Sequence, residues 1–212
     1  MQYYDYFKLR GLDDEVIRAF NLGWCREDGK SSHKDFLPFI DSRFYNKVLF
    51  PIYNLHGSLI SVSSRSIQKD EKGYIHTAYS KRFHLYGLNV TYPYILSSRK
   101  VYIVEGNFDL LTLYKQGIKN VVAMLGSKLS LEQASLLVRF ADELILASDS
   151  DNAGKKCALN FVDLLKRNDI SFKILKLPFG EDPDTFVKKF GAEAFIKLEP
   201  KNLLQRVSEI KI

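Results

Sequence analysis

Acidic residues follow three short apolar runs in the second half of the chain. Glu105 comes directly after Val101–Val104. Asp149 comes two residues after Glu143–Ala147. The carboxylates at the three ends are Glu105, Asp149, Asp151, Asp182 and Asp184. If the runs are neighbouring parallel strands, their carboxyl ends meet at the edge of a sheet where open α/β folds bind ligands. We therefore expect these five side chains to converge.

Converging carboxylates need a cation, because like charges repel and raise one another's pKa. Asp149 and Asp151 are two residues apart, so extended backbone points both the same way. In Glu105-Gly-Asn-Phe-Asp109, Gly106 permits a tight turn that brings Asp109 back toward the same end. Hard oxygen ligands select Mg²⁺ or Mn²⁺. We predict a metal site with Glu105, Asp149, Asp151, Asp182 and Asp184 as its ligands.

The structural alternative is that these residues are helix N-caps and turn residues, which Asp supplies at strand-to-helix junctions. This alternative is adequate for Asp109 or Asp184 taken alone. The ordered set on successive strand ends favours the metal site.

The apolar runs that carry the carboxylates alternate with longer segments of helical period, which is typical of a βα fold. The expected strands are 101–104, 120–125, 143–147 and 172–177. The expected helices are 107–116, 130–140 and 152–168, with Gly117 and Asn168 at the C-terminal ends of the first and third. Parallel crossovers need helices, so we expect a mostly parallel four-stranded sheet covered on both faces.

The first half of the chain has a different pattern. Short helices are expected between Tyr3 and Phe20, with Asp13 as an N-cap. Lys47–Tyr53 and Gly57–Arg65 are β-rich runs around a turn, which predicts an antiparallel hairpin. Pro51 would lie at a strand edge or a bulge. The boundary between the two halves is expected near residue 95.

Positive charge is concentrated in one segment. Residues 43–100 contain nine Lys and Arg against Asp70 and Glu71, a net +7, whereas the whole chain carries +6. Interleaved aromatic residues would suit stacking on bases, but they would suit a β-sheet core equally well. A solvated surface and a nucleic-acid-binding surface both remain open at this point.

The composition excludes several classes of protein. No segment approaches the roughly 20 apolar residues of a membrane span, and no secretory leader is evident. Cys25 and Cys157 are too few and too far apart for a disulfide framework or a zinc site, so we assign them no role. We expect a cytoplasmic protein without a membrane partner.

The ordered acidic motifs resemble the TOPRIM domain, which primases, topoisomerases and certain nucleases share, and most specifically the DnaG-type primases. Glu105-Gly-Asn-Phe-Asp109 is similar to the family's Glu-Gly-Tyr-x-Asp. Asp149-Ser-Asp-Asn-Ala-Gly154 is similar to its Asp-x-Asp followed by Ala-Gly, and Leu125-Gly-Ser127 to its Leu-Gly-Thr. Gly180-Glu-Asp-Pro-Asp184 is similar to its Gly-x-Asp-Pro-Asp, which favours primase over other TOPRIM enzymes.

The resemblance extends upstream over nearly the whole chain. Tyr6–Leu12 resembles the entry of the primase polymerase domain, and Lys47–Ile52 resembles one of its strands. The resemblance implies template or nucleotide contacts for Lys47, Arg65 and Lys81. Two positions differ from the family pattern: Lys47 replaces an arginine, and His76-Thr-Ala78 replaces an Asn-Ser-Pro segment.

The resemblance implies a basic α+β subdomain over residues 1–95, an α/β, Rossmann-like TOPRIM catalytic domain over 96–200, and a helical tail over 201–212. It implies synthesis of RNA primers on single-stranded DNA from ribonucleoside triphosphates, with Mg²⁺, or Mn²⁺ as a substitute. Its catalytic residues would be Glu105, Asp109, Asp149 and Asp151.

Further partners and rival functions follow from the same resemblance. With no zinc site of its own, the chain is expected to be a fragment, a minimal phage-type primase or one part of a split primase. Its partners would include a separate zinc-binding primase module and a replicative helicase. The alternatives are a TOPRIM-type metal-dependent nuclease and a non-catalytic module that binds single-stranded DNA or a helicase. A topoisomerase is disfavoured, because no long arm region surrounds a candidate tyrosine.

Overall fold

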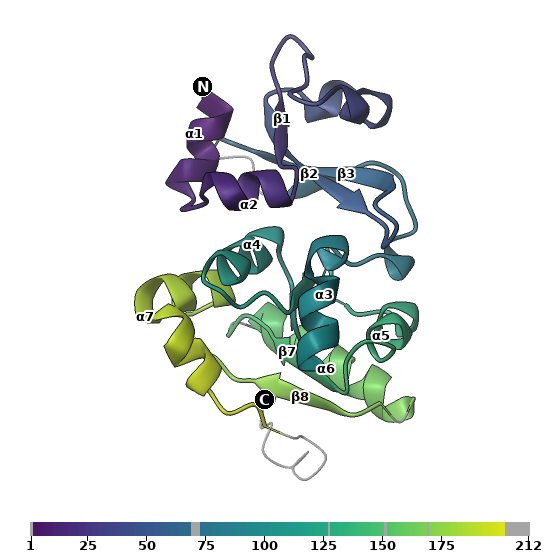
Figure 1. The fold of residues 1–212 in the computed structure, drawn as a ribbon, viewed down its shortest axis with the longest axis vertical. Coiled ribbons are helices and arrows are strands. Elements are labelled where there is room, and N and C mark those ends of the chain that lie inside the picture. Colours follow the sequence, from purple (N-terminus) through teal and green to yellow (C-terminus); the bar gives the residue numbers. More distant parts are fainter. Residues whose placement is uncertain (1, 69–72, 127, 151, 169, 202–212) are drawn as a thin grey trace. The chain divides into compact units, whose positions relative to one another are not determined.

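The structure is a computed structural model, and it describes residues 2–68, 73–126, 128–150, 152–168 and 170–201. The chain divides into two compact units. Unit 1 comprises Met1–Ser80 with Gly87–Val90, and unit 2 comprises Lys81–Tyr86 with Thr91–Ile212. Each unit has its own four-stranded sheet, and Figure 1 labels β1, β2 and β3 of unit 1 and β7 and β8 of unit 2.

The sheet of unit 1 is antiparallel, in the order β1-β2-β3-β4. Its strands are β1 (Gly23–Cys25), β2 (Lys47–Tyr53), β3 (Leu59–Ser66) and β4 (Tyr74–His76). β2 and β3 pair with Lys47 opposite Ser66, and a bulge falls between Ile52 and Tyr53. The predicted hairpin is confirmed.

Pro51 lies at a position where the absence of a backbone N–H removes no hydrogen bond between strands. It pairs with Val62 on β3. On the opposite side, the Val62 carbonyl accepts from the Thr77 amide and the Val62 amide donates to the Thr77 hydroxyl. The backbone of Pro51 therefore faces the β1 side, where pairing stops at Leu49. β2 is locally an edge at Pro51, which agrees with the expectation for a proline in a strand.

Short helices complete unit 1. They are α1 (Gln2–Leu9), α2 (Asp14–Ala19) and the 3₁₀ turns η1 (Lys34–Phe39) and η2 (Ser42–Phe44). The predicted cap at the start of α2 is confirmed, because the side chain of Asp13 accepts from the Val16 amide at 2.9 Å. One apolar cluster of this unit contains Cys25, Phe36, Phe44, Leu49 and Val62, all fully buried.

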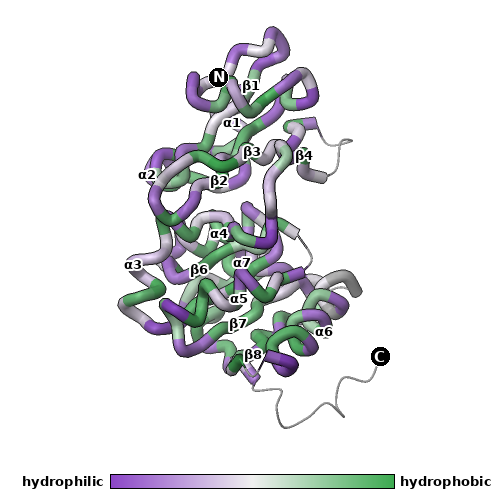
Figure 2. The backbone as a smooth tube through the Cα atoms, turned by 90° about the vertical axis from the view of Figure 1, so that its right-hand side faces the viewer, coloured by the Kyte–Doolittle hydropathy of each residue, from purple (hydrophilic) through white to green (hydrophobic). Residues whose placement is uncertain are grey.

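The sheet of unit 2 is parallel throughout, in the order β6-β5-β7-β8. Its strands are β5 (Lys100–Val104), β6 (Val121–Ala123), β7 (Glu143–Ala147) and β8 (Phe172–Leu175). Figure 2 shows β6 and β7 as hydrophobic segments, and the residues Leu144–Ala147 are fully buried. The predicted fold class is confirmed, with each strand within two residues of its expected bounds.

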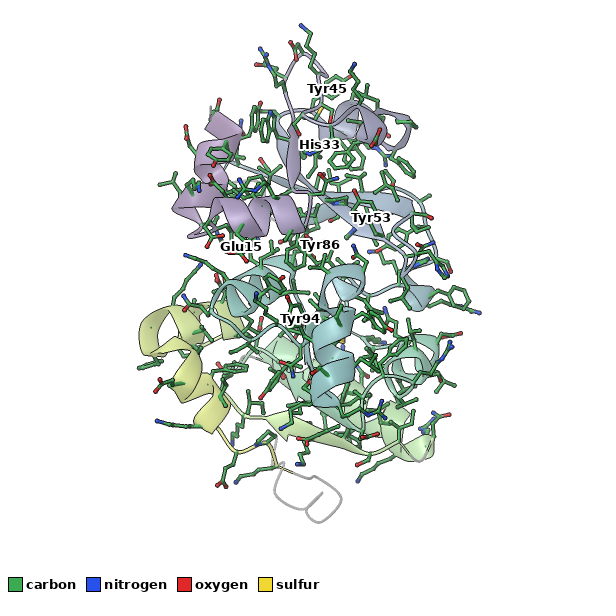
Figure 3. All side chains as sticks on the ribbon, viewed as in Figure 1. Glu15, His33, Tyr45, Tyr53, Tyr86 and Tyr94 are labelled. Carbon is green, nitrogen blue, oxygen red and sulfur yellow. The ribbon has the colours of Figure 1, made fainter. Side chains whose placement is uncertain are left out.

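The sheet edge at β6 is extended by one further backbone contact. Tyr86, labelled in Figure 3, exchanges two backbone hydrogen bonds with Ala123, at 2.9 and 3.1 Å. Both residues belong to unit 2. The pairing satisfies backbone groups that would otherwise stay open at the end of the sheet.

The helices of unit 2 are α3 (Leu88–Ser98), whose first three residues belong to unit 1, α4 (Asn107–Lys115), α5 (Leu131–Leu137), α6 (Asn152–Arg167) and α7 (Pro183–Lys197), with the 3₁₀ turn η3 (Lys81–Phe83). α4, α5 and α6 were expected; α3 and α7 were not. The start of α7 has a sequence signature, because Asp182 as N-cap and Pro183 at the first helical position are a favoured pair. None of the described helices is long and apolar enough to cross a membrane.

Gly154 allows the first turn of α6 to lie directly against the end of β7. A Cβ atom built on Gly154 would lie 1.9 Å from the backbone oxygen of Asp149, a distance that no side chain tolerates. The glycine of the Asp-x-Asp motif is therefore required by this close approach.

We expect Gly154→Ala to lower the free energy of unfolding by about 1–3 kcal/mol, because the backbone around Asp149 must shift. Gly126→Ala is the matched control, since nothing lies within 4 Å of its added methyl group. Urea denaturation followed by circular dichroism measures both. Equal stability of the two variants would contradict the close packing of α6 on Asp149.

Candidate active site

The ends of β5 and β7 bring two of the predicted site residues to the same edge of the unit 2 sheet. β5 and β7 are hydrogen-bonded parallel neighbours, with Ile103 opposite Leu146. Glu105 follows β5 directly, and Asp149 follows β7 after one residue. The Ser150 amide donates to the Glu181 carbonyl at 3.1 Å, so the turn after β7 is tied to the loop before α7.

Asp109 links the turn after β5 to the start of α7 through two hydrogen bonds. Its Oδ2 accepts from the Gly106 amide at 3.0 Å, which caps the start of α4. Its Oδ1 accepts from the Asp184 amide at 3.3 Å. Burial raises the pKa of Asp109 well above its usual range, and the charges of Asp149, Asp182 and Asp184 add to the rise. Four acidic side chains thus interact electrostatically at one place in unit 2.

Asp182 and Asp184 each have hydrogen-bond partners in the protein. Asp182 is the N-cap of α7, and its Oδ1 accepts from the Thr185 amide at 2.6 Å. The buried carboxylate of Asp184 accepts from the Thr112 hydroxyl and from Lys188. Asp182 is therefore a helix N-cap, as the structural alternative expects. The metal-ligand role of Asp182 and of Asp184 stays a prediction.

Cys157 lies beside Glu105, which the sequence did not indicate. Its thiol is buried in α6, three residues after Gly154, and it hydrogen-bonds with the Glu105 side chain. Burial, followed by the negative charge of Glu105, raises the pKa of Cys157 to about 12. The thiol is therefore protonated at neutral pH, and α6 presents a neutral group to the carboxylate.

The residues at this edge fit a divalent cation by their chemistry. They offer carboxylate oxygens, and a bound cation would offset the burial and the acidic neighbours that raise the pKa of Asp109. Within the described residues, no group of three or more His, Cys, Asp or Glu side chains is arranged to hold a metal ion. Asp151, one of the predicted ligands, lies outside the described residues.

A cavity opens beside Asp149. Its volume is about 350 Å³, and its lining includes Ser148, Asp149 and Ser150 from the end of β7. The opposite lining comes from β8 and the residues after it, with Ile174 and Leu177 among them. The turn that carries Asp149 is therefore accessible to a small molecule from this side.

Two of the three basic residues predicted to contact template or nucleotide, Lys47 and Arg65, lie on opposite faces of the unit 1 sheet. Opposing residues of an antiparallel pair share a face, so Lys47 lies on the face of Ser66, and Arg65 lies on the other face with Val48. Arg65 stacks over the ring of Tyr74, 5.4 Å from its centroid. Lys81 belongs to unit 2, and partial burial lowers its pKa.

We expect the stability of Asp109→Asn, relative to the wild type, to rise between pH 4 and pH 8 in EDTA. A carboxyl whose folded pKa is raised stabilises the protein below its unfolded pKa and loses that contribution as pH rises through the folded pKa. The variant side chain has one acceptor oxygen in place of two, so the variant is less stable than the wild type at pH 4. This difference in stability closes or reverses at pH 8.

Asp142→Asn is the control, because Arg99 lowers the pKa of Asp142 and a lowered pKa confines the change in stability to pH values below this interval. Its stability relative to the wild type should stay nearly constant between pH 4 and pH 8. Thermal unfolding by differential scanning fluorimetry measures both trends. A pH-independent difference for Asp109→Asn would contradict the electrostatic interaction of Asp109 with its acidic neighbours.

Comparison with known proteins agrees with this arrangement. A family profile described as Toprim-like matches residues 102–187. The chain is 34% identical to a DNA primase of Clostridium acetobutylicum over 91% of this chain and 36% of that protein. It is 33% identical to a DNA primase of Aquifex aeolicus over 92% of this chain and 44% of that protein. The chain thus spans less than half the length of these relatives.

Solved structures give the same result. The zinc-binding and RNA polymerase domains of the Aquifex aeolicus primase match with a TM-score of 0.82 and 29% identity, over 94% of this chain and 56% of that chain. A DnaG primase catalytic domain bound to single-stranded DNA matches with a TM-score of 0.79 and 28% identity, over 93% of this chain and 71% of that chain. The chain therefore contains a Toprim-like domain and is similar over most of its length to DNA primases and to DnaG catalytic cores.

Proposed function

We propose that the chain catalyses RNA primer synthesis on single-stranded DNA by metal-dependent nucleotidyl transfer. The observation that carries the proposal is the set of acidic residues that interact at Asp109 beside the ends of β5 and β7. The homology to DNA primases supports this reaction over other reactions of TOPRIM domains.

The proposed chemistry joins a primer 3′-hydroxyl to an incoming ribonucleotide. The hydroxyl oxygen attacks the α-phosphorus, the bond to the β-phosphate oxygen breaks, and pyrophosphate leaves. Mg²⁺, held by Glu105, Asp149 and Asp151 with Asp182, would supply charge neutralisation on the phosphates. Glu105, which directly follows β5, would accept the hydroxyl proton.

The α4 turn and the loop before α7 fix the reacting side chains. Asp109 caps the Gly106 amide, which holds the turn that carries Glu105. The bond from the Ser150 amide to Glu181 holds the turn that carries Asp149. Such positioning matters because a displacement of about 1 Å in a catalytic group costs about 100-fold in rate.

The partners of the proposed reaction are single-stranded template and ribonucleoside triphosphates. One matching structure is of a primase domain bound to single-stranded DNA, and another includes a zinc-binding domain. We propose that this chain also works with a zinc-binding module and a replicative helicase. Manganese would substitute for magnesium, since it has the same preference for oxygen ligands.

Cleavage of nucleic acid is the rival function, because a nuclease would use the same carboxylates. The two reactions differ in their requirement for triphosphates. A nuclease should degrade single-stranded DNA without ribonucleotides, whereas a primase should consume them to lengthen RNA.

We expect the chain, supplied with a zinc-binding primase module and Mg²⁺ or Mn²⁺, to make short labelled oligoribonucleotides on single-stranded DNA. Asp149→Asn should reduce the product at least 100-fold, because the isosteric amide removes a proposed metal-ligand charge. Asp163→Asn, on the exposed part of α6, should leave the yield unchanged. DNA degradation in place of RNA synthesis would favour the nuclease.

We expect Arg65→Gln to weaken binding to single-stranded DNA and to reduce the slope of log K against log salt by about 0.7, the effect of one lost phosphate contact. Lys47→Gln and Lys81→Gln test the other two predicted contacts in the same way. Lys173→Gln, which removes a cation paired with Glu143, is the control. Fluorescence anisotropy at several KCl concentrations measures the slopes. Unchanged slopes in all three variants would place the template surface elsewhere.

A further inference from the structure

The carboxylate of Asp184 is held by groups from two helices. Its Oδ1 accepts from Thr112 Oγ1 at 2.5 Å and lies 2.6 Å from Lys188 Nζ. Thr112 is on α4, and Lys188 is one turn after Asp184 on α7. Asp184 is 6% exposed and Thr112 is 2% exposed, so the hydroxyl bond is shielded from water. A buried hydroxyl needs such a partner, and the carboxylate provides it.

The backbone of Asp184 faces the active-site turn. Its amide donates to Asp109 Oδ1, and Asp109 Oδ2 accepts from the Gly106 amide. Gly106 directly follows Glu105. A continuous series of hydrogen bonds therefore runs from Lys188 and Thr112, through Asp184 and Asp109, to the turn that carries Glu105.

We propose that Asp184 is a positioning residue and not a metal ligand, with Lys188 and Thr112 as the groups that hold it. This inference rests on the proposed function and revises the ligand role expected for Asp184 from its motif. The carboxylate locks the start of α7 against α4, and the amide then orients Asp109. The metal is left to Glu105, Asp149, Asp151 and Asp182.

The charges at the site support this division. Asp149, Asp182 and Asp184 all act on Asp109, and the Lys188 ammonium forms an ion pair with Asp184. A cation binding to Asp184 Oδ1 would compete with the ammonium and with the Thr112 hydroxyl for the same oxygen. Losing either short charge-assisted hydrogen bond from a buried oxygen is costly, so a metal ion is better served by the neighbouring carboxylates.

The test is Mn²⁺ binding by calorimetry to a variant that removes the ion pair without changing the net charge. In Asp184→Asn with Lys188→Gln, the amide oxygen still accepts hydrogen bonds and the backbone amide is unchanged. We expect the Mn²⁺ dissociation constant to stay within about threefold of the wild type. Asp149→Asn is the positive control, and a loss of tenfold or more is expected there because a ligand is removed.

A tenfold or greater loss of Mn²⁺ affinity in the double variant would overturn the proposal, because it would make Asp184 a ligand. Glu193→Gln with Lys197→Gln is the matched control, since this exposed pair has the same spacing on α7. Asp184→Asn with Lys188→Met is the second variant if the first does not fold. The Mn²⁺ dissociation constants are compared only for variants whose circular dichroism spectra match that of the wild type.

Catalysis provides the second readout, which separates positioning from simple stability. We expect Lys188→Met to lower kcat for ribonucleotide incorporation about tenfold or more, with KM for the nucleotide within about twofold. Lys188→Arg should restore kcat, because it keeps the cation, and Lys197→Met should have no effect. An unchanged kcat in Lys188→Met would overturn the proposal. If the wild type makes no RNA, the proposed function fails, and the Mn²⁺ measurements still decide the role of Asp184.

Discussion

The repulsion among buried carboxylates is the constraint on which unit 2 depends. Burial raises the pKa of Asp109, and the charges of Asp149, Asp182 and Asp184 raise it further. Such an arrangement destabilises a folded domain at neutral pH unless protons, protein cations or a metal ion offset the charges. A domain whose only requirement was stability would replace these residues, so their convergence points to chemistry that needs negative charge at the sheet edge.

The surrounding structure holds the carboxylates in place despite their repulsion. The parallel pairing of β5 with β7 sets Glu105 and Asp149 on neighbouring strands. Gly154 lets α6 lie against the Asp149 backbone, and the Ser150 amide fastens that turn to Glu181. Lys188 offsets part of the charge at Asp184. The sheet, a glycine and a few hydrogen bonds thus convert separate sequence motifs into one site.

The sequence predicted the central sheet well, because buried parallel strands are continuous apolar runs that end in polar residues. The run at Glu143–Ala147 coincides with β7. α7 was missed because Gly180–Asp184 was interpreted as a binding loop, although Asp182 followed by Pro183 is also a helix start. Both interpretations apply to the same residues, since the loop ends in the cap of the helix.

Contacts that depend on tertiary geometry could not be predicted. Lys47 and Arg65 were both expected to contact template or nucleotide, and only the strand register reveals that they lie on opposite faces of the sheet. Register depends on the hairpin turn and on the bulge near Tyr53, and one residue of shift reverses every face. The contact of Cys157 with Glu105 also required the placement of α6 on the sheet.

The central claim is that these carboxylates form a divalent-cation site, and thermal unfolding with and without Mg²⁺ tests it most directly. The Tm of the wild type should rise saturably by several degrees with millimolar MgCl₂, relative to KCl of equal ionic strength, because a ligand that binds only the folded state stabilises it. The rise should be lost in Asp149→Asn. An identical Tm in both salts for the wild type would contradict the account.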